Sequence, residues 1–264
     1  MERIVNSMND VLTADQSRIM ERVLAQEEVK REHVVVYLSG AHAYGFPSPD
    51  SDLDLKAIHV AKTSELVGLE VPLPTSDRAE IIDGVEIDYT SNELAHALAG
   101  ILNGNGNFLE RVLGRLVPHR SPLLAELSDV ARRALSRRVH RHYRGFAHNQ
   151  LRFLEKDPTA KKLLYVLRTT LTGIHLLREK ELEPDLTQLM DRYGLADAAT
   201  LIERKRAGER VALDESQVGA WMPRISGLFE QLDAACDASA LPESPDNEME
   251  ARAWLISVRR AKWA

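Results

Sequence analysis

The chain has 264 residues, enough to bury a substantial core, and its 44% apolar and 28% charged content is typical of a globular protein. Its one cysteine, Cys236, excludes an internal disulfide framework and a cysteine-based zinc site, which favours a reducing cytoplasmic location. The net charge of -6 argues against indiscriminate nucleic-acid binding over the whole surface, and no apolar run is long enough to span a membrane.

The first predicted elements are a helix and two strands. Thr13 followed by Gln16 resembles a capping box, and the apolar stripe after it predicts a helix. Residues 34–38, VVVYL, form a short β-branched run that suits a buried strand. A turn with glycine and proline follows. The alternating stretch at residues 52–60, DLDLKAIHV, then predicts a second strand.

A loop and a third strand come next. Residues 72–77 are rich in proline and serine and predict a loop. The stretch GVEIDYT at residues 84–90 alternates, so Ile87 and Tyr89 share one face of a strand while Asp88 lies on the other. Helical periodicity resumes around Glu93.

Helical patterns dominate from about Ser121 onward, with the change of character near residues 116–122. We therefore expect an α+β fold of two units, a mixed sheet with flanking helices over residues 1–118 and a C-terminal helical domain over residues 119–264. One of its helices begins near Lys161.

Two carboxylates two residues apart raise the question of what balances their charge. On a strand, Asp52 and Asp54 point to the same face, and like charges that close disfavour each other unless a cation lies between them. The residues leave three candidates open: a metal ion, a basic side chain, or only a solvated strand edge.

The surroundings of this pair favour a phosphate-transfer site. Asp88 lies on the polar face of the third predicted strand, and three carboxylates on neighbouring strands can hold two divalent cations for in-line displacement at phosphorus. Mg²⁺, with Mn²⁺ as a substitute, suits these oxygen ligands. Gly40 and Gly45 would let the backbone approach a triphosphate and direct N–H groups at its oxygens.

These motifs resemble the nucleotidyltransferase superfamily that DNA polymerase beta typifies. The signature is Gly40-Ala41, ten residues, and then DLDL at residues 52–55. The stretches AHAYGFPSPDSDLDLKAI, GVEIDYTSNEL and KKLLYVLR together resemble its RlaP/YcgL-like branch, which is linked to RNA repair. The resemblance covers most of the chain. It implies a nucleotidyltransferase-type sheet and a helical domain that closes over the nucleotide and acceptor site.

The resemblance also implies roles for individual residues. Asp52 and Asp54 match the metal-binding catalytic pair, and Asp88 matches the third carboxylate, which helps to activate the acceptor hydroxyl. The residues expected to bind the nucleotide lie in the glycine turn and in the helix near residue 161. They are Ser39, Gly40, His42, Gly45, Ser51, Lys161, Tyr165 and Arg168.

One position departs from the family pattern. Relatives usually have Gly-Ser where this chain has Gly40-Ala41, so a hydroxyl for the β- and γ-phosphates is missing. The lost hydrogen bond is worth about 1 kcal/mol, and up to about 3 kcal/mol if it is charge-assisted. Ser39 or Ser51 is the available substitute, and His42 stands where relatives often carry arginine.

A basic segment follows the predicted boundary. Residues 130–152 include seven arginines, three histidines and no carboxylate. On one continuous helix, a single face would carry Arg133, Arg137, Arg141 and Arg144. Charge runs usually mean only a solvated face, whereas the sharper interpretation is a wall that faces the phosphates of RNA or of a triphosphate.

The leading hypothesis is an enzyme that moves a nucleoside monophosphate from an NTP to a hydroxyl and releases pyrophosphate. We expect two Mg²⁺ ions as cofactors, an RNA end as the acceptor and no membrane partner, whereas the sequence indicates no particular protein partner. A protein hydroxyl, as in toxin-neutralising nucleotidyltransferases, is the alternative acceptor. A catalytically degenerate nucleotide- or RNA-binding protein is the alternative class.

Overall fold

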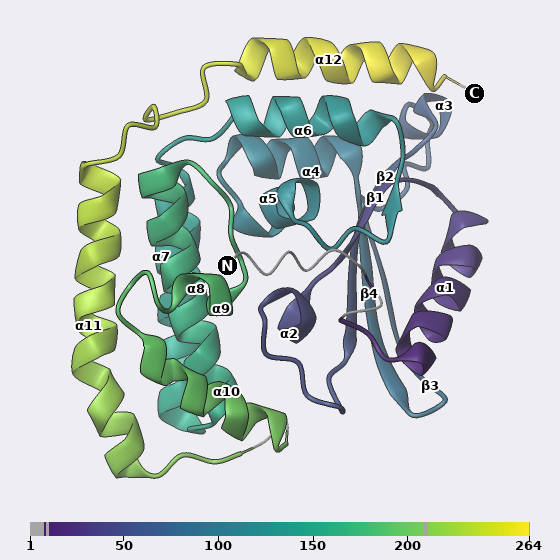
Figure 1. Cartoon of the computed structure of the whole chain (residues 1–264). Helices are drawn as coiled ribbons and strands as arrows, with labels where there is room; N and C mark the ends of the chain where they lie inside the picture. Colours follow the sequence, from purple (N-terminus) through teal and green to yellow (C-terminus); the bar gives the residue numbers. More distant parts are fainter. Residues whose placement is uncertain (1–7, 9–10, 209–210, 264) are drawn as a thin grey trace.

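A mixed sheet lies at the centre of the computed structural model, which describes residue 8, residues 11–208 and residues 211–263. Its strand order is β3-β4-β2-β1-β5 (Figure 1). The strands are β1 (Glu32–Leu38), β2 (Leu53–Val60), β3 (Thr75–Ile82), β4 (Val85–Glu93) and β5 (His119–Arg120). β2 and β4 run parallel, whereas the other neighbouring pairs run antiparallel.

Helices cover both faces of the sheet. α1 (Ala14–Glu28) packs on one face, where Ile19 and Val23 join the core formed by Leu53 and Leu55. The helices that share the other core are α2 (Gly40–Ala43), α4 (Leu94–Leu102), α5 (Gly106–Leu113) and α6 (Leu123–Arg133). The short α3 (Thr63–Leu66) follows β2.

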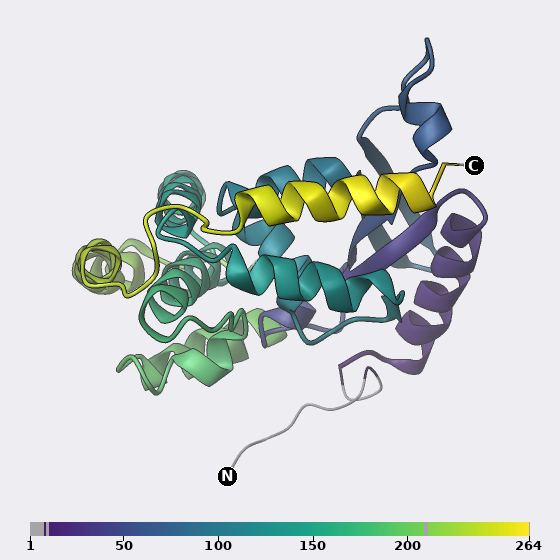
Figure 2. The same cartoon turned by 90° about the horizontal axis from the view of Figure 1, so that it is seen from above.

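The remaining helices pack beside this layer. They are α7 (Val139–Lys156), α8 (Ala160–Glu179), α9 (Leu186–Leu189), the 3₁₀ turn η2 (Ala196–Ala198), α10 (Ala199–Arg206), α11 (Glu215–Asp237) and α12 (Glu248–Ala261). α7, α8 and α11 run alongside one another, while α12 returns to lie alongside α4 and α6 (Figures 1 and 2). None of the helices within the described residues is both long and apolar enough to cross a membrane.

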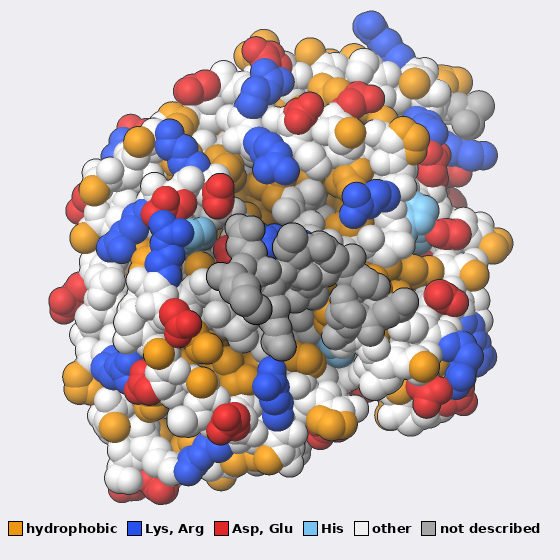
Figure 3. All heavy atoms as spheres, in the orientation of Figure 1, with side chains coloured by type: hydrophobic (Ala, Val, Ile, Leu, Met, Phe, Trp, Pro, Cys, Tyr) orange, Lys and Arg blue, Asp and Glu red, His pale blue; other side chains and the backbone are white. Residues whose placement is uncertain are grey.

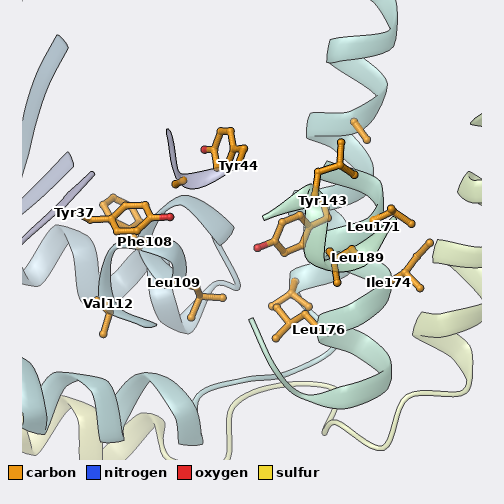
Figure 4. Packing of buried hydrophobic residues seen from close by; sticks show 14 of the residues in the cluster. Tyr37, Tyr44, Phe108, Leu109, Val112, Tyr143, Leu171, Ile174, Leu176 and Leu189 are labelled. Carbon is orange, nitrogen blue, oxygen red and sulfur yellow. The ribbon is translucent and has the colours of Figure 1, made fainter. Parts of the chain in front are cut away.

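The core on the second face continues from the sheet into the helical layer. Tyr37 of β1 and Leu109 of α5 lie on the sheet side of this cluster, and Tyr143 and Leu171 lie on the helical side (Figure 4). Tyr44, just after α2, belongs to the same cluster. β5 lies beyond residue 118 and yet pairs within the sheet. The division into residues 1–118 and 119–264 stays a prediction.

The alternation along β2 determines which face carries the functional residues. Leu53, Leu55 and Ala57 are buried against α1, so Asp54 and Lys56 point to the opposite face. The sequence predicted this separation correctly, and the α+β class, with a mixed sheet, flanking helices and C-terminal helices, is confirmed.

The sequence analysis was wrong about residues 72–77, part of which begins a strand. β3 pairs antiparallel with β4 across Asp83-Gly84, whose φ angles of 51° and 83° make a tight hairpin turn. β3 lies at the sheet edge, and its side chains are largely solvated, with Ile81 exposed. The apolar face that marks a core strand is therefore weak here.

Candidate active site

The turn after β1 holds the backbone against the carboxylate of Asp54. Gly40 has φ +65°, and a Cβ on it would lie 1.9 Å from Oδ2 of Asp54. Both the left-handed backbone and the close approach therefore require glycine. The Ser39 N–H donates to the Asp54 carbonyl at 2.8 Å, which fixes the turn to β2.

Asp54 and Asp88 face each other on neighbouring strands. They are direct partners in the parallel pairing of β2 with β4, and Asp52 immediately precedes β2. The Asp54 side chain is 25% exposed and the Asp88 side chain 53%. Burial raises the pKa of Asp54 to about 6, the charges of Asp88 and Asp52 add to this, and those of Lys56 and Lys161 oppose it. The Asp54 carboxylate is thus a group that a cation would stabilise.

Lys56 supplies a cation to both carboxylates. Its Nζ lies 2.8 Å from Oδ2 of Asp88 and 3.7 Å from Oδ1 of Asp54. A basic side chain, one of the three candidates that the sequence left open for Asp52 and Asp54, is therefore present beside Asp54. The sequence could have indicated this contact, because Lys56 follows Asp54 by two residues and so shares its strand face. The sequence analysis did not assign Lys56 a role.

A cavity of about 210 Å³ opens beside these residues. It is lined by the end of β1, by β2, β4, the α2 turn and the helices α5, α7 and α8. The lining residues are Ser39, Gly40, Tyr44, Asp54, Lys56, Asp88, Asn107, Glu110, Arg111, Phe146, Tyr165 and Arg168. The predicted nucleotide-binding residues Ser39, Gly40, Tyr165 and Arg168 thus share one cavity with Asp54 and Asp88. The α7 and α8 residues form a wall that the sheet alone could not provide.

A buried ion pair fixes that wall to the glycine turn. Arg168 Nη1 lies 2.7 Å from Glu110 Oε1, and both side chains are 3% exposed. The Tyr44 hydroxyl donates to Glu110 Oε2 at 3.2 Å, and the Arg168 guanidinium stacks 3.5 Å from the Tyr44 ring centroid. Arg168 is thus already bound within the protein, and its predicted contact with a nucleotide stays a prediction. The sequence gave no signal for Glu110.

Lys161 lies one turn before Tyr165 on α8. Its charge is the smallest of the influences on the pKa of Asp54, which it lowers, and Lys161 is not among the residues that line the cavity. The predicted contact of Lys161 with a triphosphate stays a prediction.

Besides Lys161, three predicted nucleotide-binding residues are not among those that line the carboxylate cavity. His42 and Gly45 line a separate hollow of about 580 Å³ that also includes Asp185. A Cβ on Gly45 would lie 2.0 Å from Oδ1 of Asp185, so its left-handed turn packs against a protein carboxylate. Burial, with the charge of Lys205, lowers the pKa of His42 to about 4 and keeps the ring neutral at pH 7.

The third of these residues, Ser51, belongs to a buried polar cluster. Lys205 of α10 is completely buried, and its Nζ donates to Ser51 Oγ at 3.2 Å and to Ser48 Oγ. The Ser48 N–H also donates to Ser51 Oγ. Lys205 therefore holds the loop that leads into Asp52. Its position inside the charged stretch ERKRAGER gave no sign of burial.

The prediction that one helix carries all four arginines of the basic segment is wrong. α6 ends at Arg133 and α7 begins at Val139. The Arg137 N–H donates to the Pro242 carbonyl at 2.8 Å between them. Neither proline nor glycine marks this break in the sequence. A contact with the distant C-terminal loop stabilises it instead.

Two of the arginines pair with carboxylates from distant parts of the chain, although the basic segment itself carries none. Arg133 pairs with Glu250, and Arg144 lies 3.2 Å from Asp233 and over the ring of Phe229. On the face in Figure 3, blue basic side chains are interspersed with red acidic ones over the described residues. RNA binding by Arg133, Arg137, Arg141 and Arg144 stays a prediction.

The chemistry of the site suits a divalent ion at one end. The carboxylate oxygens of Asp52 and Asp54 are the ligand type that Mg²⁺ prefers, whereas Asp88 is engaged by Lys56. Within residues 11–208 and 211–263, no three His, Cys, Asp or Glu side chains are grouped closely enough to hold a metal. Bound nucleotide and water would have to complete the coordination.

A mixed sheet with a glycine turn against paired acidic strands, closed by helices, defines a protein of the nucleotidyltransferase class. Residues 15–257 match the RlaP family, described as the RNA repair pathway DNA polymerase beta family, and the chain belongs to this family.

Relatives span most of the chain. It is 28% identical over 212 residues to an uncharacterized protein of Methanocaldococcus jannaschii, covering 78% of this chain and 84% of that protein. It is 29% identical over 238 residues to the uncharacterized protein YcgL of Bacillus subtilis, covering 85% and 88%. A nucleotidyltransferase-like protein from Exiguobacterium sibiricum, known from a crystal structure, gives a TM-score of 0.33 at 11% identity. That comparison covers 92% of this chain and 79% of the other.

Proposed function

We propose that the protein transfers a nucleoside monophosphate from an NTP to a hydroxyl group at an RNA end and releases pyrophosphate. The observation that carries the proposal is the Asp54 carboxylate, mostly buried, opposite Asp88 and packed on Gly40, in a cavity walled by α7 and α8. The raised pKa of Asp54 shows that its charged form is disfavoured where it lies, so a bound cation would stabilise that form.

Asp52 and Asp54 would hold the divalent metal, Mg²⁺ or Mn²⁺. When bound, it neutralises phosphate charge and favours ionisation of an attacking hydroxyl. Asp88, the more exposed carboxylate, is suited to orient the acceptor hydroxyl and accept its proton. Lys161 would bind the triphosphate as a charge partner. Tyr165 and Phe146 offer aromatic surfaces for the nucleoside.

A non-catalytic nucleotide- or RNA-binding protein is the second candidate. The observation that favours it is the Lys56 ammonium, which neutralises Asp88 without any metal. Ala41, which lacks the hydroxyl usual in the family, points the same way. The two candidates differ in whether the protein releases pyrophosphate.

The test is pyrophosphate release from each NTP with Mg²⁺ and total RNA. We expect release by the unaltered protein and a loss of at least about 100-fold in Asp54→Asn, since a metal-binding carboxylate is removed. Asp83→Asn is the matched control, because Asp83 lies in the β3–β4 hairpin turn and asparagine tolerates its positive φ. Equal release by Asp54→Asn and the control would rule out the proposed site.

A further inference from the structure

A further hollow, here called the α5 hollow, lies between α4, the start of α5 and α7. Its volume is about 480 Å³, and its lining includes Asn103, Asn105, Phe108, Arg141 and His142. Among the described residues, none lines both this hollow and the carboxylate cavity. Sites for small ligands usually have volumes of about 300–1,000 Å³. The α5 hollow is therefore large enough to take one nucleotide.

Neighbouring residues form the wall between the α5 hollow and the carboxylate cavity. Asn105 lines the hollow and Asn107 lines the cavity, so the first residues of α5 lie between them. The ring of His142 in the hollow is stacked on the ring of Phe146 in the cavity, with centroids 5.8 Å apart and planes at 14°. A strand that ends in the carboxylate cavity can therefore place its preceding residue in the α5 hollow.

The His142 ring is held in place by the backbone of α5. A Cβ on Gly106 would lie 2.6 Å from Cδ2 of His142, so only glycine leaves room for this packing. Burial, with the charge of Arg168, lowers the pKa of His142 to about 4, so the imidazole is neutral at pH 7. The hollow thus contains an uncharged aromatic ring in a fixed position, which suits stacking with a base.

The polar side chains of the α5 hollow suit the other parts of a nucleotide. Asn103 and Asn105 carry amides, which can pair with the hydrogen-bonding edge of a base. Arg141 is exposed and forms no ion pair with another described residue, so its guanidinium can bind a phosphate. No carboxylate is present among the described residues that line the hollow. A ring, amides and a cation together are typical of sites for single-stranded RNA.

We infer that the α5 hollow binds the nucleotide just before the 3′ end of the acceptor RNA, with its base on His142 and its phosphate at Arg141. This inference rests on the proposed function, which brings the terminal hydroxyl to Asp54 and Asp88. It makes the acceptor a single-stranded 3′ end, because a paired base is stacked within its duplex and cannot enter the hollow.

The test is the affinity of the full chain, without NTP, for a short single-stranded RNA with a fluorophore at its 5′ end, measured by anisotropy. One RNA is intact, and a second lacks the base of the nucleotide before the 3′-terminal one. We expect the unaltered protein to bind the second RNA about tenfold more weakly, since one stacked base is lost. An RNA that lacks a base near its 5′ end should bind as the intact RNA does.

Variants assign this difference to the α5 hollow. His142→Ala should bind intact RNA about tenfold more weakly, and loss of the base should then have no further effect. His142→Phe keeps a ring and should retain the preference for intact RNA. Asn103→Ala, at an exposed position, should reduce the preference. His148→Ala, an exposed position of α7 that lines neither space, is the matched control, and thermal unfolding verifies that each variant is folded.

Equal affinity of the unaltered protein for the two RNAs would overturn the inference, as would an undiminished preference in both His142→Ala and Asn103→Ala. Weaker binding of NTP but not of RNA in these variants would also overturn it, because the hollow would then take the base of the NTP. The measurement needs no turnover, so it separates this inference from the proposed function. The expected affinities without any nucleotide transfer would contradict the proposed function alone.

Discussion

The surroundings of Asp54 suit a ligand-binding carboxylate but lower the stability of the folded protein when no ligand is bound. It is held against Gly40 and opposite Asp88, and burial is the largest cause of its raised pKa. A carboxylate in such surroundings is stabilised by ligands and destabilises the protein without them. The same residue therefore gives predictions for both stability and activity.

The first prediction concerns the dependence of stability on pH without divalent ions. The pKa of Asp54 is about 6 in the folded protein, above the ordinary aspartate value of 3.8, so the folded state binds the extra proton between these values. The contribution of Asp54 to the free energy of unfolding therefore falls as pH rises through this window. Asp54→Asn should be more stable than the unaltered protein at pH 7, by on the order of 1–2 kcal/mol.

Urea unfolding in EDTA at several pH values measures this difference. The advantage of Asp54→Asn should vanish below about pH 4, where both states of the unaltered protein carry the proton. An advantage that is equal at pH 4 and pH 7 would mean that the Asp54 charge is not the cause.

The second prediction concerns Lys161. Its charge lowers the pKa of Asp54, and if Lys161 binds the triphosphate, Lys161→Ala should raise the KM for NTP about tenfold and change kcat less, as expected for a ground-state phosphate contact. Lys162→Ala is the matched control, because the Lys162 ammonium is held by the Asp157 carbonyl at 2.8 Å. A large loss of kcat at constant KM would instead assign Lys161 to the transition state.

At the scale of elements, contacts from the helical layer hold the loops of the site. The Glu110–Arg168 pair joins α5 to α8, and Lys205 of α10 holds the loop that precedes Asp52. The sequence predicted β1, β2, β4 and the start of α8. It could not predict these polar contacts, since they join residues far apart in the chain.

The third prediction concerns Lys205. Lys205→Met keeps the side-chain volume and removes the donor to Ser48 and Ser51. We expect a loss of about 1–3 kcal/mol in the free energy of unfolding, since buried polar groups lose a partner. Amide exchange over residues 46–52 should quicken, whereas Arg204→Met on the same helix should leave it unchanged. Unaltered exchange in Lys205→Met would show that Lys205 does not hold this loop.

The fourth prediction concerns the basic segment. Within the part of the chain that the structure describes, Arg133 and Arg144 are paired with carboxylates, whereas Arg137 and Arg141 form no ion pair. If RNA crosses this segment, Arg137→Gln with Arg141→Gln should flatten the salt dependence of RNA affinity by about one to two units. Arg133→Gln with Arg144→Gln should flatten it less. Parallel slopes for all three proteins would indicate a solvated face.

At the scale of the whole molecule, the cavity lies between the sheet and the helical layer. The carboxylates come from the sheet and the opposite wall from α7 and α8. α12 returns to the sheet layer, where Arg259 pairs with Glu93, and the Thr63 N–H donates to the Lys262 carbonyl at 2.7 Å. Local patterns predicted the acidic strands, because register and alternation are local properties. They could not predict the break after Arg133, which a distant loop stabilises.

The most direct test of the central claim follows the phosphate that moves. The protein is incubated with Mg²⁺, RNA and NTP labelled on the α- or the γ-phosphate, with periodate-oxidised RNA, which lacks the 3′-terminal diol, as the control acceptor. Transfer of a nucleoside monophosphate predicts that α-label enters intact RNA, that γ-label leaves as pyrophosphate, and that oxidised RNA and the Asp54→Asn protein both give no labelled RNA. Label in a protein fraction would contradict RNA as the acceptor. No transfer of α-label to any acceptor, with NTP still bound, would contradict the catalytic claim itself.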